Sequence, residues 1–105
     1  MEKYPVISKN GNVYKVKVFF GESIKYAGIN IFLYQVKKGI FGQERFRVVA
    51  RYGELIDEKE LIEIFGDYIG LVSWYIEKYE ERLEIEKEAK ETLPDKFEEW
   101  DGFIR

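Results

Sequence analysis

Two segments of the chain carry cationic side chains at alternating positions. Lys15 and Lys17 alternate with valines in the first segment, and the second contains Arg45, Arg47 and Arg51. Because successive side chains of a β-strand point to opposite faces, we expect all five cations on one face of a sheet, with Phe19 beside Lys17. Cations mixed with an aromatic ring suit single-stranded nucleic acid, since charges bind phosphates and rings stack on bases.

The same pattern has a simpler interpretation. A sheet buried on one side has a polar outer face, where Lys and Arg also discourage pairing between the edges of separate molecules. The net charge of −3 favours this interpretation over nucleic-acid binding. The sequence leaves three roles open for the cationic face: solvation, binding of nucleic acid and binding of an acidic partner.

Residues suited to catalysis are scarce. The chain has no Cys and no His, which removes thiolate nucleophiles, thiolate metal sites and the commonest general base. None of the serines lies in a Gly-x-Ser-x-Gly turn, and no glycine-rich phosphate loop is present. Asp57 and Asp67 are the candidate ligands of a metal-dependent hydrolase, but Asp57 also suits a helix cap. We therefore expect a protein that is not an enzyme and holds no metal and no cofactor.

Charge is sorted along the chain. Residues 1–53 hold ten Lys and Arg against three Glu, whereas residues 54–105 hold seventeen Asp and Glu against seven Lys and Arg. Clustered charge of one sign attracts an oppositely charged surface. The two halves either serve partners or neutralise each other inside one domain. A length of 105 residues with 46% hydrophobic residues predicts a single globular domain.

The first half of the chain predicts four strands. Apolar residues alternate over Tyr4–Ser8 and Asn12–Gly21, and Asn10-Gly11 between them predicts a two-residue hairpin turn. Ile29–Lys38 is β-branched and aromatic, and Lys37 or Lys38 joins the cationic face depending on the register. In the fourth strand, the face opposite the arginines carries Phe46, Val48, Ala50 and Tyr52. Short connections between consecutive strands predict an antiparallel meander.

The second half has the hydrophobic period of helices. Asp57 is a good N-cap for a short helix over Glu58–Phe65, and a long helix should run from Asp67 to about Thr92, with one continuous helix as the alternative. The long helix exceeds the strands in length, so its last turns should extend beyond the sheet. Pro94 should end it. The aromatic tail after Pro94 either folds back on the core or waits for a partner, and we favour folding back because an uncovered patch promotes aggregation.

These elements predict an α+β domain, ββββαα in order, with both helices on one face of the sheet and a short C-terminal helical segment. The expected core consists of Tyr14, Val16, Val18, Phe20, Phe46, Val48, Ala50, Phe65, Val72 and Ile76.

For function, we expect a non-catalytic protein-interaction or regulatory module that forms a homodimer or docks on another protein. The expected contact residues are Ile40, Phe41, Leu83, Trp100 and Phe103. The alternative is a nucleic-acid-binding protein that uses the cationic face. The sequence predicts no small-molecule substrate. It shows no signal peptide and no membrane-spanning stretch, so we expect a cytoplasmic location and no membrane partner.

Overall fold

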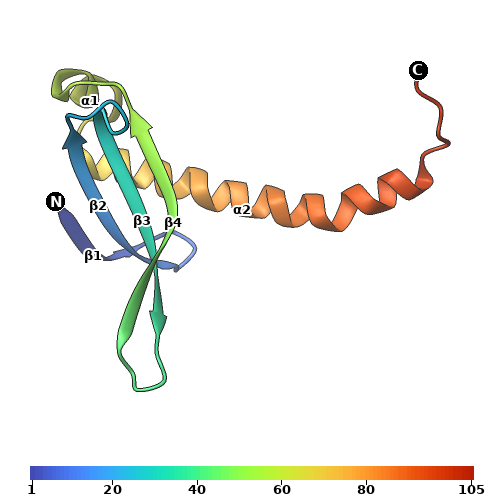
Figure 1. Ribbon diagram of the computed structural model, residues 1–105, viewed down its shortest axis with the longest axis horizontal. Helices are drawn as coiled ribbons and strands as arrows, with labels where there is room; N and C mark the ends of the chain where they lie inside the picture. Colours follow the sequence, from blue (N-terminus) through green and yellow to red (C-terminus); the bar gives the residue numbers. More distant parts are fainter.

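The computed structural model describes residues 1–105 and contains four strands followed by two helices (Figure 1). The strands are β1 (Glu2–Ile7), β2 (Val13–Gly21), β3 (Gly28–Lys38) and β4 (Glu44–Glu54), and the helices are α1 (Glu58–Phe65) and α2 (Tyr68–Glu99). Neighbouring strands pair antiparallel in the order β1-β2-β3-β4. The predicted α+β fold with ββββαα order is confirmed. Figure 1 shows α2 crossing behind the sheet and then continuing beyond it.

The loop between β1 and β2 is longer than the predicted two-residue turn. Gly11 N donates to Ser8 O at 2.9 Å, and Ser8 N donates to Asn12 O at 2.9 Å. Gly11 has a φ of 84°, but Asn10 does not have the positive φ that a two-residue type I′ turn requires. The hairpin therefore closes through a wider loop, with glycine at the left-handed position.

A β-bulge in β4 reverses the predicted faces of half of that strand. Leu33 of β3 pairs with Ala50, but the next residue, Tyr34, pairs with Val48, so Val49 is an extra residue. Because side chains alternate along a strand, one extra residue moves every preceding side chain to the other face. Ala50 and Tyr52 pack against the helices as predicted. Phe46 and Val48, in contrast, lie on the face away from the helices.

The core lies between the inner face of the sheet and the two helices. Its ten buried hydrophobic residues are Tyr14, Val16, Val18, Ile29, Ile31, Leu33, Leu61, Leu71, Tyr75 and Ile76. Four predicted members are therefore confirmed, namely Tyr14, Val16, Val18 and Ile76. Val48, Ala50, Phe65 and Val72 are half-buried.

The prediction was wrong for Phe20 and Phe46, which are 37% and 38% exposed. Phe20 points to the inner face, but the N-terminal segment pairs with β2 only as far as Val18, through Met1, so Phe20 lies where β2 has become an edge strand. Phe46 is turned outward by the bulge at Val49.

Capping residues set the bounds of the two helices, and Gly66 and Asp67 separate them. Asp57 caps α1 by accepting a hydrogen bond from Glu60 N at 2.8 Å, as predicted. Gly66, with a φ of 86°, ends α1, and Asp67 caps α2 by accepting from Gly70 N at 2.8 Å. A left-handed glycine at the C-cap followed by a new N-cap explains why the alternative of one continuous helix is wrong.

α2 does not end before Pro94, as predicted, but runs through it to Glu99. A proline within a helix removes one backbone hydrogen bond and crowds the carbonyl four residues earlier, here that of Lys90. All residues from 90 to 99 are exposed, so water can satisfy that carbonyl. At 32 residues, α2 is about 48 Å long.

The C-terminal tail does not fold back on the core, which corrects our expectation. Residues 97–99 form the end of α2 rather than a separate helical segment, and the last six residues lie at its far end (Figure 1). Phe97, Trp100 and Phe103 are all exposed. The tail's own contacts are local: Trp100 Nε1 donates to Phe103 O at 3.1 Å, and the Trp100 ring packs near Phe97. The length of α2 carries the tail out of reach of the sheet.

Candidate functional site

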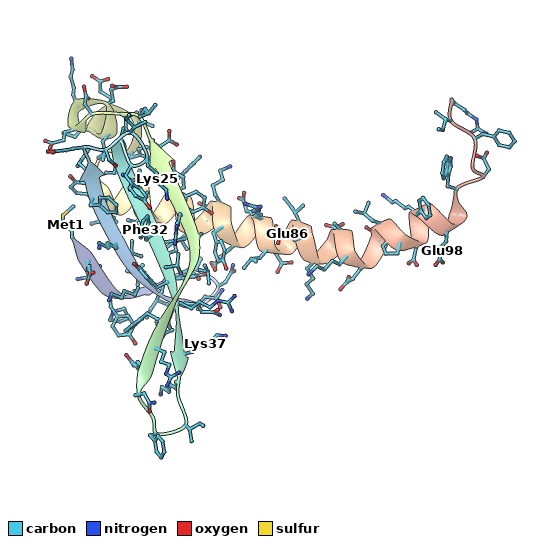
Figure 2. The ribbon with its side chains drawn as sticks, in the orientation of Figure 1. Met1, Lys25, Phe32, Lys37, Glu86 and Glu98 are labelled. Carbon is cyan, nitrogen blue, oxygen red and sulfur yellow. The ribbon has the colours of Figure 1, made fainter.

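The face of the sheet away from α2 is not covered by a helix and carries cations and aromatic rings together. We call it the outer face. Register defines it: Ile31 and Leu33 are buried under the helices, so their neighbours Phe32 and Tyr34 point outward. Its principal side chains are Lys15, Lys17 and Phe19 from β2, Phe32 and Tyr34 from β3, and Phe46, Val48 and Arg51 from β4. Figure 2 labels Phe32 near the middle of the sheet.

The cations of the outer face lie over its rings. Lys15 Nζ is 4.6 Å from the ring centre of Phe46 and 5.7 Å from that of Tyr34. Arg51 Cζ lies 5.4 Å from the centre of the Phe32 ring. Lys17 is paired in the same way with Phe19, at 5.7 Å. Such contacts hold a cation in place with little loss of its charge, so these groups remain able to bind an anion.

Carboxylates are scarce on this face. Lys15 lies 3.6 Å from the Glu2 carboxylate of β1, and this ion pair is partly exposed. No ion pair joins Lys17 or Arg51 to an acidic side chain. Tyr4 donates to Glu44 Oε1 at 2.9 Å, and this hydrogen bond to an acceptor raises the pKa of the Tyr4 phenol. The outer face is therefore predominantly basic.

Three rings form a cluster at one end of the outer face. The ring centres of Phe19 and Phe32 are 5.4 Å apart, and Tyr26 lies 6.2 Å from Phe19 and 6.4 Å from Phe32. Lys25 Nζ lies 5.4 Å from the centre of the Tyr26 ring. All three rings are half-buried, so each keeps some exposed surface. This arrangement resembles a stacking platform flanked by positive charge.

Asn30 holds Tyr26 in this cluster. The Asn30 side chain is buried and donates from Nδ2 to Tyr26 O at 2.7 Å and to Gly28 O at 3.1 Å. These bonds fix the loop that brings Tyr26 beside the strand residues. Our sequence analysis missed both residues. An asparagine among apolar neighbours in a strand was the available signal, because a buried amide needs backbone partners.

Two predicted members of the cationic face lie elsewhere. Arg45 and Arg47 pair with Lys37 and Gln35 of β3 and, because of the bulge, point to the same side of the sheet as α2. Arg47 is close enough to Tyr79 of α2 to lower its pKa, although burial of that phenol raises it by more. Lys15, Lys17, Phe19 and Arg51 do share one face, as predicted.

The predicted protein contacts are exposed but lie far apart. Ile40 and Phe41, at the tip of the β3–β4 hairpin, are 97% and 90% exposed. Leu83, Trp100 and Phe103 are also exposed, but they lie along α2 and the tail. The fold therefore does not gather these five residues into one patch.

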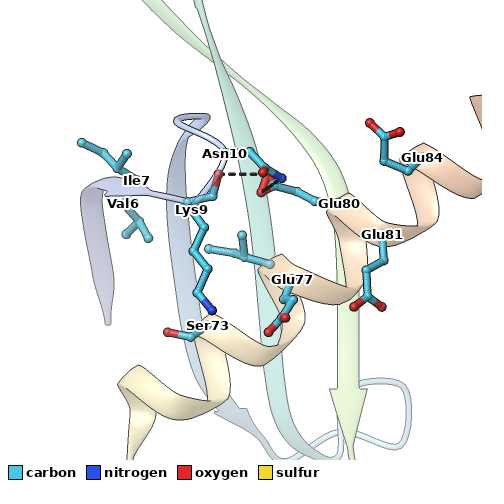
Figure 3. Close-up of a pocket in the computed structure, with 11 residues that line it drawn as sticks. Val6, Ile7, Lys9, Asn10, Ser73, Glu77, Glu80, Glu81 and Glu84 are labelled. Atoms are coloured by element: carbon cyan, nitrogen blue, oxygen red, sulfur yellow. Dashed lines mark hydrogen bonds between the residues drawn. The ribbon is translucent and has the colours of Figure 1, made fainter.

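A buried carboxylate joins α2 to the β1–β2 loop on the other side of the molecule. Glu80, only 8% exposed, accepts from Ser8 Oγ at 2.9 Å, Asn12 Nδ2 at 2.8 Å and Tyr14 OH at 3.3 Å. Asn10 Nδ2 lies farther away, at 3.4 Å from Glu80 Oε1 (Figure 3). Burial and the Glu80 charge raise the pKa of the Tyr14 phenol. Glu80 therefore anchors the hairpin to α2.

Beside Glu80 lies an open cavity of about 390 Å³, between the β1–β2 loop and α2. Ser73, Glu77, Glu81 and Glu84 line its helical side, and Lys9 extends toward Ser73 across it (Figure 3). No three carboxylates converge closely enough to hold a metal ion. Asp57 and Asp67, the candidate ligands from sequence, are engaged as helix caps. No helix is both long and apolar enough to cross a bilayer.

Comparison with known proteins yields one informative similarity. The chain is 29% identical over 105 residues to the SPbeta prophage-derived uncharacterized protein YoqB of Bacillus subtilis (strain 168). This similarity covers 97% of the present chain and 93% of that protein. No protein-family model matches the chain. No solved structure matches it either.

Proposed function

We propose that this chain is a non-catalytic, cytoplasmic binding protein whose outer face binds single-stranded nucleic acid. One observation carries the proposal: Lys15, Lys17 and Arg51 lie directly over aromatic rings on a single uncovered face. Cations bind phosphates and aromatic rings stack on unpaired bases, and this face carries both groups side by side. Part of this arrangement of cations and rings is predicted by the sequence, because Lys15, Lys17 and Phe19 alternate along β2.

The shape of the surface favours single strands over duplex. A broad sheet cannot enter the major groove as a helix or a two-stranded ribbon does. Rings on the surface of a sheet are reached only by bases that have left their stack. The three-ring cluster of Phe19, Tyr26 and Phe32 would therefore accept splayed bases, with Lys17, Lys25 and Arg51 beside it for the phosphates.

The net charge of −3 does not oppose this proposal. Charges separated by more than about 8 Å are largely screened at physiological salt, so the local surface matters more than the total. Half of the acidic residues lie on α2, which covers the opposite face or extends beyond the sheet.

Fluorescence anisotropy with a labelled thymidine oligonucleotide of about 15 nucleotides tests the proposal. Lys17→Glu with Arg51→Glu should weaken binding at least about tenfold at 0.1 M salt, because two phosphate-binding charges become repulsive. Lys9→Glu with Lys59→Glu is the matched control. It changes the net charge equally at two exposed positions off the outer face and should leave affinity nearly unchanged.

A second variant separates stacking from charge. Phe19→Leu keeps an apolar side chain but removes a ring, and it should weaken binding by about fivefold or more, the effect of one lost stacking contact. Equal loss in the control and the outer-face variant would show only non-specific charge attraction. Absence of salt-sensitive binding by the wild-type chain would remove the proposal.

The protein-interaction function expected from sequence has separate support, in the part of α2 that leaves the sheet. It uses other residues and is developed below as an independent proposal.

A further inference from the structure

Almost the last quarter of the chain extends away from the domain. We call residues 81–105 the arm. Of these residues, Ala89 alone is half-buried and all others are exposed. Figure 1 shows the arm leaving the sheet at a large angle to the β3–β4 hairpin. Isolated helices of this length are marginal in water, and pairs such as Arg82 with Glu86 add only a few tenths of a kcal/mol. The arm continues a helix that the core already nucleates, and a second surface would stabilise it further.

An apolar stripe along the arm indicates where that second surface binds. With 3.6 residues per turn, Leu93, Phe97 and Trp100 fall within an arc of about 100° that begins at Leu83. Tyr75 and Tyr79, which pack on the core, fall on the same arc. The side of α2 that covers the sheet therefore continues along the arm where there is no sheet to cover, as a stripe of Leu83, Leu93, Phe97 and Trp100 that Arg82, Glu86 and Lys90 interrupt.

Charge identifies the complementary surface. The arm has nine Asp and Glu against five Lys and Arg. Residues 35–47, the outer part of the β3–β4 hairpin, have four Lys and Arg against Glu44 alone. Lys37, Arg45 and Arg47 are exposed on the α2 side of this hairpin, and no carboxylate forms an ion pair with any of them. The hairpin tip adds the two exposed apolar side chains of Ile40 and Phe41.

We propose that the arm binds the β3–β4 hairpin of a second copy of this chain, and that the second arm binds the first hairpin in return. Acidic side chains bordering the stripe would face Lys37, Arg45 and Arg47 of the other copy, while Phe97 and Trp100 would reach its Ile40 and Phe41. Each copy supplies one arm and one hairpin, so a two-fold dimer satisfies both surfaces.

Dimensions agree with this pairing. The helical part of the arm, residues 81–99, is about 28 Å long. The outer hairpin from Gln35 to its tip is about 17 Å long, so the arm can span it. Only the first turns of the arm, as far as Glu86, lie near β4 of the same molecule. Beyond Glu86 the arm cannot bind its own hairpin, because the two extend from the domain in different directions (Figure 1). The expected contacts from sequence, Ile40, Phe41, Leu83, Trp100 and Phe103, all belong to these two surfaces.

Sedimentation equilibrium of the full chain tests the proposal through two charge reversals. Variant one carries Glu84→Lys, Glu91→Lys and Glu98→Lys, three positions seven residues apart along one side of the arm, which leave six acidic against eight basic side chains there. Variant two carries Arg45→Glu and Arg47→Glu. In each variant alone, arm and hairpin have the same sign, so both should sediment near the monomer mass of 12.6 kDa while the wild type sediments near twice that mass.

Mixing the two variants gives the decisive result. A basic arm then meets an acidic hairpin, and an acidic arm meets a basic hairpin, so the mixture should recover dimers at the wild-type concentration dependence. A wild type that stays monomeric would overturn the proposal and leave the arm to a different protein. Dimers that survive both reversals, or a mixture that stays monomeric, would also overturn it. The outer face is unchanged in these variants, so nucleic-acid binding is tested independently.

Discussion

Replacing Glu80 should destabilise the protein far more than replacing any other acidic residue of α2. Glu80 is 8% exposed and accepts hydrogen bonds from Ser8, Asn12 and Tyr14, which tie the β1–β2 loop to the helix. Glu84 lies one turn further along α2 and is exposed, and its carboxylate forms neither a hydrogen bond nor an ion pair. It is therefore the matched control for Glu80.

The size of the effect follows from the fate of each donor. Hydrogen bonds to a charged group contribute about 1.5–3 kcal/mol each, but water can replace the acceptor for donors near the surface. The Ser8 and Asn12 donors lie near the surface, so water can replace Glu80 as their acceptor. The Tyr14 hydroxyl is buried and is left without an acceptor. Because the variant no longer buries a carboxylate, part of this loss is offset, and Glu80→Ala should lower the free energy of unfolding by about 2 kcal/mol. That is a large share of the 5–15 kcal/mol typical of a domain.

Urea denaturation followed by far-ultraviolet circular dichroism measures this difference. Glu84→Ala should stay within about 0.5 kcal/mol of wild type. The unfolding free energy of Glu80→Gln should fall between those of the two alanine variants. The glutamine carbonyl can still accept one hydrogen bond, but its amide group is itself a donor and faces other donors. Equal unfolding free energies for Glu80→Ala and Glu84→Ala would refute the role of Glu80 as the anchor of the hairpin.

Two further predictions concern pH and the arm. Burial, together with the Glu80 and Glu54 carboxylates, raises the pKa of the Tyr14 and Tyr75 phenols above 10, so the folded state holds these protons more tightly than the unfolded state. Stability should therefore be complete below pH 10 and fall as the pH rises beyond it, and Tyr14→Phe should flatten that decline in urea titrations. A chain that ends at Lys90, made in the Arg45→Glu, Arg47→Glu background to remove self-association, should unfold within about 0.5 kcal/mol of its parent, because the deleted residues pack on nothing. A larger loss in the same titration would show that the tail contacts the core.

The order of elements could be predicted because each carries a strong local signal. Alternation over β2, the Asp57 cap and the period of α2 each depend on residues close in sequence. The short helix over Glu58–Phe65 was predicted with its observed bounds. Tyr14, Val16 and Val18 were assigned to the core correctly because β2 lies at the centre of the sheet along these residues, with β1 and β3 on either side.

The membership of the outer face could be predicted only in part. Lys15, Lys17 and Phe19 belong to one uninterrupted strand, so alternation places them correctly. Arg45 and Arg47 precede the bulge at Val49, and nothing in Arg-Val-Val-Ala indicates which residue is extra. A bulge depends on the register with the neighbouring strand, which is a long-range property. The same error assigned Phe46 to the core.

The C-terminal half of α2 shows the limit of single-residue rules. Pro94 ends a helix when the lost hydrogen bond leaves a carbonyl without a partner, and solvent removes that penalty here. The tail was expected to fold back because its rings are apolar. Whether a C-terminal tail can pack on the core depends on where the preceding helix ends. α2 ends far from the sheet, so the tail cannot reach it.

The asymmetry of charge between the two halves is not neutralised inside the molecule. If it were, cations of the strands would pair with carboxylates of the helices. The observed ion pairs are Lys15 with Glu2, which joins two strands, and four pairs that each lie within α1, α2 or the tail. None crosses from the first half to the second. The positive surfaces of the sheet and hairpin and the acidic arm therefore remain separate, and each retains a field that can attract an oppositely charged partner. Nucleic acid suits the outer face, where the cations lie on rings, and a second copy suits the hairpin and arm, where each half of the contact is already present.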